Sequence, residues 1–146
     1  MTRGLILTTL CLALWFSIGC KPKASVKRLE PSQPIASQSL DISSQTLEMG
    51  LRDTLNFGSM HQGEVVAKSL KITNRDTVPI VLLRHVTSCG CVDVIYDRKP
   101  IGPNQSTVIE FKFDSKSLLG WQMKLMEFYF ADKATPMKIY IDAEVE

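Results

Sequence analysis

The stretch Met137-Lys138-Ile139-Tyr140-Ile141-Asp142-Ala143-Glu144-Val145-Glu146 decides the fold class of this chain of 146 residues. Apolar residues hold every second position from Met137 to Val145, and Lys, Tyr, Asp and Glu fill the positions between them. Successive side chains of a β-strand point to opposite faces, so this stretch predicts a strand with one buried and one solvent-exposed face.

The same period of two recurs upstream. Ile109, Phe111 and Phe113 alternate with charged residues, and residues 64–74 repeat the scheme with Val66, Leu70 and Ile72. Further strands are predicted at residues 79–86, 91–96 and 123–130. Turn-forming residues separate these strands, namely Asn74-Arg75-Asp76, Gly102-Pro103-Asn104 and Gly120, with a further connection expected at residues 59–62 between Gly58 and Gly63. We therefore predict an all-β fold, an antiparallel immunoglobulin-like β-sandwich of about seven strands over residues 47–146.

Residues 1–19 resemble the signal peptide of a bacterial lipoprotein. Arg3 precedes an uncharged apolar run at residues 5–18, and Ser17-Ile18-Gly19-Cys20 resembles a lipobox that is cleaved before its cysteine. An ordinary secretory signal and an uncleaved helix are the alternatives, but the run is shorter than the roughly 20 residues that a membrane span needs. We expect a lipid on Cys20 and a position in the cell envelope, anchored to the outer membrane and facing the periplasm.

Residues 20–46 are predicted to form a flexible tether after the lipidated cysteine. Lys, Pro, Ser and Gln dominate this range, and its prolines, Pro22, Pro31 and Pro34, oppose a helix. A flexible coil of this length spans on the order of 25 to 30 Å, which is enough to lift a domain clear of a bilayer.

The charge balance argues against nucleic-acid binding. The chain has 17 Lys and Arg against 15 Asp and Glu, and loss of Arg3 with the signal leaves 16 basic residues. With basic and acidic residues so nearly equal in number, the protein produces no strong electrostatic field that would attract a polyanion such as nucleic acid.

The landmarks of the folded part resemble those of a known family. They are Phe57-Gly58-Ser59-Met60, Ile72-Thr73-Asn74, Ser88-Cys89-Gly90-Cys91, Pro100-Ile101-Gly102-Pro103 and Phe113-Asp114. In this order they resemble a bacterial domain-of-unknown-function family, common in Bacteroidota lipoproteins, with an S-C-G-C-T motif in one Hydin-like, immunoglobulin-like domain. Val92 stands where the family usually has Thr, and Asn104 where its proline loop usually has Gly. The resemblance implies a fold and a compartment but no activity.

Cys89 and Cys91 are the only residues of the folded part that form a chemical motif. In an extended strand their Cα atoms would be about 6.5 Å apart, near the upper limit for a disulfide. Gly90 between them allows the backbone to bend so that the two cysteines come closer together. We expect the pair at a strand end in the sandwich core, and three interpretations stay open: a structural pair, bridged or free; a copper(I) or zinc site; and a redox-active dithiol. His85 is the nearest candidate for a further metal ligand, with Met60 and His61 as more distant ones.

No catalytic motif accompanies the cysteines, and two histidines leave little material for acid-base chemistry. We expect no enzyme and no cofactor, but a monomeric module that binds an envelope protein or a glycan, with thiol-based metal handling or redox chemistry as the alternative. Trp121 beside Gly120 is a weak indication of a carbohydrate platform. Asp53-Thr54-Leu55 and Asp76-Thr77-Val78 resemble acceptor sites for O-glycosylation in or near predicted turns.

Overall fold

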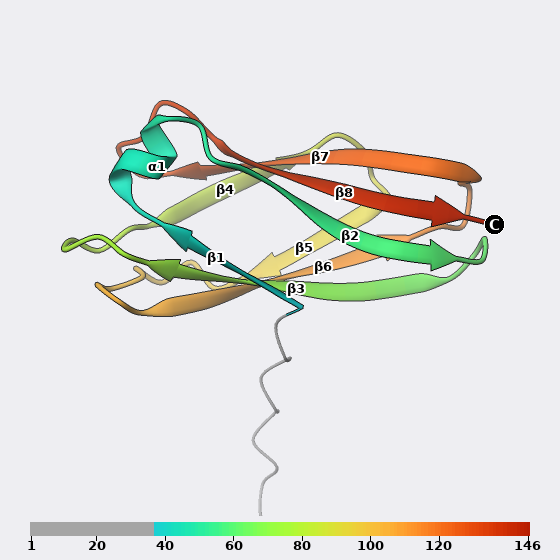
Figure 1. The fold of residues 1–146 in the computed structure, drawn as a ribbon, viewed down its shortest axis with the longest axis horizontal. Helices are drawn as coiled ribbons and strands as arrows, with labels where there is room; N and C mark the ends of the chain where they lie inside the picture. The colour runs from blue at the N-terminus through green and yellow to red at the C-terminus, as the bar shows by residue number, and fades with distance from the viewer. Residues whose placement is uncertain (1–36) are drawn as a thin grey trace, which may run out of the picture. The chain divides into compact units, whose positions relative to one another are not determined.

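Two four-stranded sheets packed face to face make up the part of the chain that the computed structural model describes, residues 37–146. One sheet has the order β1-β3-β6-β5 and the other the order β2-β8-β7-β4 (Figure 1). The elements are β1 (Gln38–Ile42), α1 (Ser44–Glu48), β2 (Arg52–Met60), β3 (Val65–Asn74), β4 (Leu82–Thr87), β5 (Val92–Tyr96), β6 (Ser106–Asp114), β7 (Gly120–Phe130) and β8 (Met137–Val145). The predicted all-β sandwich is confirmed.

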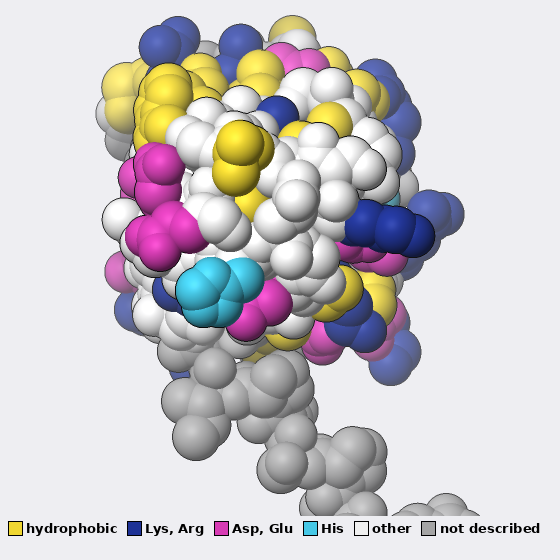
Figure 2. Space-filling model, turned by 90° about the vertical axis from the view of Figure 1, so that its right-hand side faces the viewer, with side chains coloured by type: hydrophobic (Ala, Val, Ile, Leu, Met, Phe, Trp, Pro, Cys, Tyr) yellow, Lys and Arg dark blue, Asp and Glu magenta, His cyan; other side chains and the backbone are white. Residues whose placement is uncertain are grey.

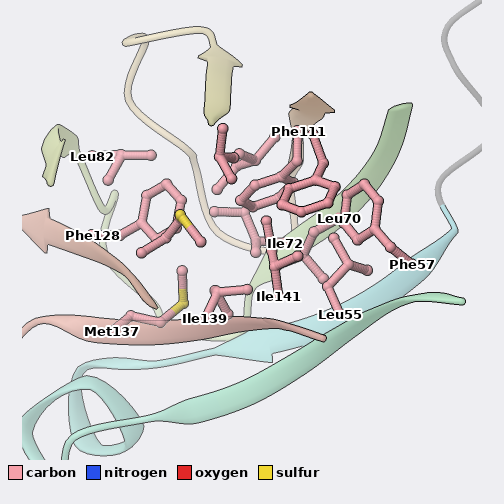
Figure 3. Packing of buried hydrophobic residues seen from close by; sticks show 14 of the residues in the cluster. Leu55, Phe57, Leu70, Ile72, Leu82, Phe111, Phe128, Met137, Ile139 and Ile141 are labelled. Atoms are coloured by element: carbon pink, nitrogen blue, oxygen red, sulfur yellow. The ribbon is translucent and has the colours of Figure 1, made fainter. Parts of the chain in front are cut away.

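The alternation that predicted the strands fills the space between the sheets. Every second residue of β8 from Met137 to Val145 is buried, as are Ile109, Phe111 and Phe113 of β6. Figure 3 shows the side chains of both sheets meeting in one layer, where Phe111 packs edge-on against Phe128 with ring centroids 5.9 Å apart. Burying one such side chain contributes about 1.5–3 kcal/mol, so this layer is the main source of stability.

The prediction that all strands pair antiparallel is wrong for two pairings. β1 pairs parallel with β3, and β2 pairs parallel with β8, so both sheets are mixed. Parallel neighbours cannot be joined by a tight hairpin. The chain instead crosses from β1 in one sheet through α1 to β2 in the other, and each of these two strands then lies along an open edge.

The folded part begins before residue 47, so the predicted tether at residues 20–46 is too long at its C-terminal end. Residues 38–42 form β1 and residues 44–48 form α1, and the side chains of Ile42 and Leu47 are fully buried. Ser43 caps the helix because its hydroxyl accepts a hydrogen bond from the Thr46 amide. The rest of the predicted tether, up to residue 36, and the predicted signal peptide lie outside the described residues.

β2 was also missed, because its alternation is interrupted. Residues 52–60 are one strand, and the predicted connection therefore shrinks to the tight turn after Met60. The register against β8 shifts between Asn56 and Gly58, and Gly58 takes a φ of 74° at this bulge. Gly63, in the turn, has a φ of 90°, a conformation that glycine adopts without a side-chain clash.

Candidate functional site

The Cys89-Gly90-Cys91 segment forms the turn that carries the chain from one sheet to the other, between β4 and β5. The two cysteines are joined by a disulfide, and their Cα atoms are 5.3 Å apart, closer than an extended strand allows. The Cys91 amide donates a hydrogen bond to the Cys89 sulfur over 3.3 Å. The pair therefore lies after β4 and before β5, in a turn, and not at a strand end within the core as predicted.

Backbone contacts fix this turn on both sides. The Ser88 amide donates to the Leu125 carbonyl, and the Ser88 hydroxyl accepts from the Leu125 amide, both over 2.9 Å. The Cys91 carbonyl accepts from the Asp114 amide of β6, also over 2.9 Å. Both cysteines are half-buried against the edge of the core, while Gly90 is exposed. A partner in solution can therefore approach the disulfide from the side of Gly90 but not from the side of the core.

His85 does not join the cysteines. Its Nδ1 lies 3.3 Å from the Tyr96 hydroxyl, and its ring packs between Tyr96 and Phe128. Burial lowers the pKa of His85 below its ordinary value, and the positive charge of Arg98 lowers it further. A neutral imidazole is thus favoured at this contact between β4 and β5.

Met60 and His61 lie at the same end of the sandwich as the cysteines, since β2 ends there and β4 also ends there (Figure 1). Met60 is buried in the core, whereas His61 is exposed in the turn to β3. Among residues 37–146, no three or more His, Cys, Asp or Glu side chains gather closely enough to share a metal ion. The candidate ligands Cys89, Cys91 and His85 are therefore near in sequence but are not assembled into one site.

A second feature lies on the outer face of the β2-β8-β7-β4 sheet. Trp121 of β7 is 61% exposed, and its Nε1 donates to the Asp142 carboxylate over 2.6 Å. Beside the indole is an open hollow of about 220 Å³, here called the Trp121 hollow, lined by Asn56, Gly58, Ser59, Trp121, Asp142, Ala143 and Glu144. Figure 2 looks onto the neighbouring end of the sandwich, where apolar side chains gather along the upper rim, the side on which Figure 1 shows β7.

The sequence indicated Trp121 but not its neighbours. Asp142 and Glu144 occupy outward positions of β8 that the alternation already predicted, yet only the register places Glu144 opposite Trp121. Ser59 joins them because β2 pairs parallel with β8 and faces Glu144 there. No sequence signal specifies that a distant segment forms the edge strand next to β8, so this set of side chains could not be found from the sequence.

The two threonines of the glycosylation hypothesis lie in different settings. Thr77 is exposed in the bend between β3 and β4. The carboxylate of its neighbour Asp76 accepts hydrogen bonds from the Ser44 and Thr77 amides. Thr54 is exposed too, but it lies within β2, so its predicted place in or near a turn is wrong.

Cys20 lies outside the described residues. In the part of the chain that the structure describes, no helix is long and apolar enough to cross a bilayer.

The fold defines this protein as an all-β sandwich domain whose two sheets are connected by a disulfide-bonded turn. Comparison with known proteins identifies its family. The chain belongs to the family of proteins of unknown function designated DUF1573, whose model matches residues 49–145. A search of curated proteins found no match.

Three solved structures share the fold. A protein of unknown function from Porphyromonas gingivalis W83 is 20% identical with a TM-score of 0.56, over 75% of this chain and 49% of that one. The Vibrio cholerae proteases VesB and VesC are 17% and 11% identical, with TM-scores of 0.50 and 0.51 over 62% of this chain. The chain corresponds to only 30% of VesB and 21% of VesC, and at these identities the likeness extends to the fold alone.

Proposed function

We propose that this protein is a lipid-anchored binding module of the cell envelope, held by Cys20 and acting through the outer face of its β2-β8-β7-β4 sheet. The lipobox-like sequence before Cys20 supports the anchor. The Ser88-Cys89-Gly90-Cys91 motif supports a place among Bacteroidota lipoproteins that carry this domain.

One observation carries the binding role: apolar side chains lie exposed on this outer face. They form a strip over β4, β7 and β8, here called the apolar strip, made of the exposed residues Val86, Trp121 and Met123 and the half-buried residues Leu125 and Tyr140. Trp121, Met123 and Val86 are 61%, 50% and 42% exposed. Exposed apolar surface of this kind marks interaction sites, since water contact with it is unfavourable.

The opposite sheet has a different outer surface. Its outward positions on β6 carry Glu110 and Lys112, which form an ion pair over 3.5 Å, and Lys71 of β3 is exposed. Exposed ion pairs of this kind are well solvated and contribute little to association. Val65 and Ile95 are also exposed on this sheet, but they lie on β3 and β5, and β6 with its ion pair lies between these strands. The residues of the apolar strip adjoin one another, and this contiguity favours the strip as the binding surface.

Photocrosslinking in cells tests this proposal. We expect a photoreactive amino acid at position 123 to capture a partner of defined size, because Met123 lies in the middle of the strip. The same amino acid at position 71, on the opposite sheet, is the matched control and should capture nothing specific. Equal capture at both positions, or none at position 123, would contradict a binding role for this face.

The disulfide supports a second candidate function, thiol–disulfide exchange with an exported partner. The observation that favours it is access, because the bridge lies in a surface turn beneath exposed Gly90. In such a reaction a partner dithiol becomes a disulfide while Cys89 and Cys91 take up its two electrons and two protons as thiols. Once reduced, the pair would offer soft ligands to copper(I) or zinc.

A count of free thiols with and without reductant, together with metal analysis of protein purified from the periplasm, tests this second function. The exchange function requires a bridge that mild reductant opens, so that free thiols appear only after treatment, and metal handling requires bound metal. A pair that is bridged throughout, carries no metal and resists mild reductant would exclude both.

A further inference from the structure

We infer that the Trp121 hollow is a binding site for a neutral carbohydrate, a single sugar ring of which stacks on the indole while its hydroxyl groups donate to the carboxylates of β8. The inference rests on the proposed function, because it names the chemical class of the ligand that the module binds.

The indole supplies the stacking surface. It is exposed, and its orientation is fixed because Nε1 donates to Asp142. The face of an aromatic ring carries partial negative charge, which attracts the weakly positive C–H bonds on the apolar face of a sugar ring. A fixed indole loses little conformational entropy when a ring stacks on it, so the platform is ready before the ligand arrives.

The polar lining supplies acceptors for hydroxyl groups. The Glu144 carboxylate and the Ser59 hydroxyl have no hydrogen-bond partner among residues 37–146, and both line the hollow beside the indole. An ionised carboxylate accepts only, with two oxygens, so it pairs naturally with the hydroxyl donors of a sugar. Hydrogen bonds with a charged partner are the stronger kind, which gives the site selectivity beyond stacking.

The volume and the charge of the hollow limit the kinds of ligand that it can bind. A hollow of about 220 Å³ is smaller than the roughly 300–1,000 Å³ of pockets that enclose drug-sized ligands, so it holds one ring, with the rest of the glycan lying along the open sheet. Asp142 and Glu144 line it and no Lys or Arg does. Two negative charges without a cation repel uronic or sialic acids, and the site therefore selects neutral sugars.

The same charges disfavour a protein in the hollow. The centres of protein interfaces are depleted in Asp and Glu, because a carboxylate that loses its water without gaining donors is costly. Sugar hydroxyls provide such donors.

Isothermal titration with defined oligosaccharides tests the inference. The full lipidated chain is held in a detergent without a sugar headgroup and titrated with cellohexaose, laminarihexaose, chitohexaose and the acidic hexagalacturonate. We expect at least one neutral sugar to bind with a Kd below about 1 mM and hexagalacturonate not to bind. Trp121→Ala should weaken binding about 10- to 30-fold, whereas Ile95→Ala, an exposed apolar residue on β5 of the opposite sheet, should change it less than about twofold. Glu144→Gln should weaken the repulsion of hexagalacturonate.

The outcomes separate this inference from the proposed function. If no neutral sugar binds, or if Trp121→Ala binds as tightly as the unchanged protein, the carbohydrate site is wrong. If position 123 nevertheless captures a protein in cells, the strip is a protein interface and the binding module stands. If both experiments fail, both proposals are wrong.

Discussion

Asn74 shows how much a single polar residue does in this domain. Its side chain is fully buried, yet its amide donates to the Val78 and Ile101 carbonyls over 2.8 and 2.9 Å and its oxygen accepts from the Asp76 amide. The sequence predicted a turn that begins at this residue. The structure gives Asn74 a further role, because its side chain ties the bend after β3 to the loop before β6.

Replacing Asn74 should therefore be costly. Asn74→Ala removes three hydrogen bonds and empties part of a fully buried site, so we expect a loss of about 2–4 kcal/mol in the free energy of unfolding. Urea denaturation, with an unchanged m-value, measures it. Asn56→Ala is the control, since Asn56 is exposed and its side-chain oxygen accepts a single hydrogen bond, from the Gly58 amide. Similar losses in the two variants would contradict the bracing role.

His85 gives the stability a pH dependence. The pKa of His85 is lowered in the folded protein, so between that value and the ordinary value of about 6.5 the unfolded chain binds a proton that the folded one does not. The free energy of unfolding should rise with pH through this window and lose this slope above it. His85→Gln should flatten the slope, measured by urea denaturation at a series of pH values. His61→Gln, an exposed control, should retain it.

At the scale of elements, β1 and α1 extend the domain beyond its predicted start. Their sequence offered no pattern, because each has five residues with a single buried side chain, which is too few to show a period, and Ser and Gln surround them. Their place in the fold comes from the rest of the molecule. Leu40 opposes Ile72 in the parallel pairing with β3, and Ile42 lies in the common core.

Ile42→Ala and Leu47→Ala should each cost about 2–5 kcal/mol, the usual effect of emptying a fully buried site. Met49→Ala, whose side chain is 72% exposed just after α1, should change the free energy of unfolding by less than about 0.5 kcal/mol. Chemical denaturation compares the three. If the first two variants match the third, this segment does not belong to the cooperative unit.

The sequence predicts well which segments form strands but poorly which strands pair with one another, and particular residues show why. Period two identified β8 and β6 because one face of each is buried throughout. β2 was not predicted because its bulge at Gly58 interrupts the alternation of buried and exposed residues. The Cys89–Cys91 motif was visible, but its place in a turn between sheets, and the grouping of Trp121 with Glu144, depend on pairings between segments far apart in the chain.

At the scale of the whole molecule, the disulfide closes a turn that connects the two sheets. If its role is structural, replacing both Cys89 and Cys91 with Ser should cost about 1–3 kcal/mol and leave a deletion strain complemented wherever the protein folds. Thermal unfolding and complementation measure the two effects. A double variant that melts like the unchanged protein but does not complement would favour thiol chemistry instead.

The anchor is tested independently. Cys20→Ser should prevent lipidation and release the protein from the membrane fraction, because one acyl chain binds only marginally and two or more hold stably. The unchanged protein should resist high-salt washing of membranes. Equal retention of the variant would refute the lipoprotein assignment.

Each of the four edge strands of the described sandwich is either short or irregular in its pairing. β1 and β5 have only five residues each, and the registers of β2 and β4 are broken, at Asn56/Gly58 and Leu82/Arg84. Short or bulged edges are poor templates for a further strand. A protein confined to a membrane surface meets its own copies far more often than one free in three dimensions. If this domain is anchored as proposed, its short and irregular edge strands would oppose pairing between the sheets of neighbouring copies, and association would fall to the side chains of the apolar strip.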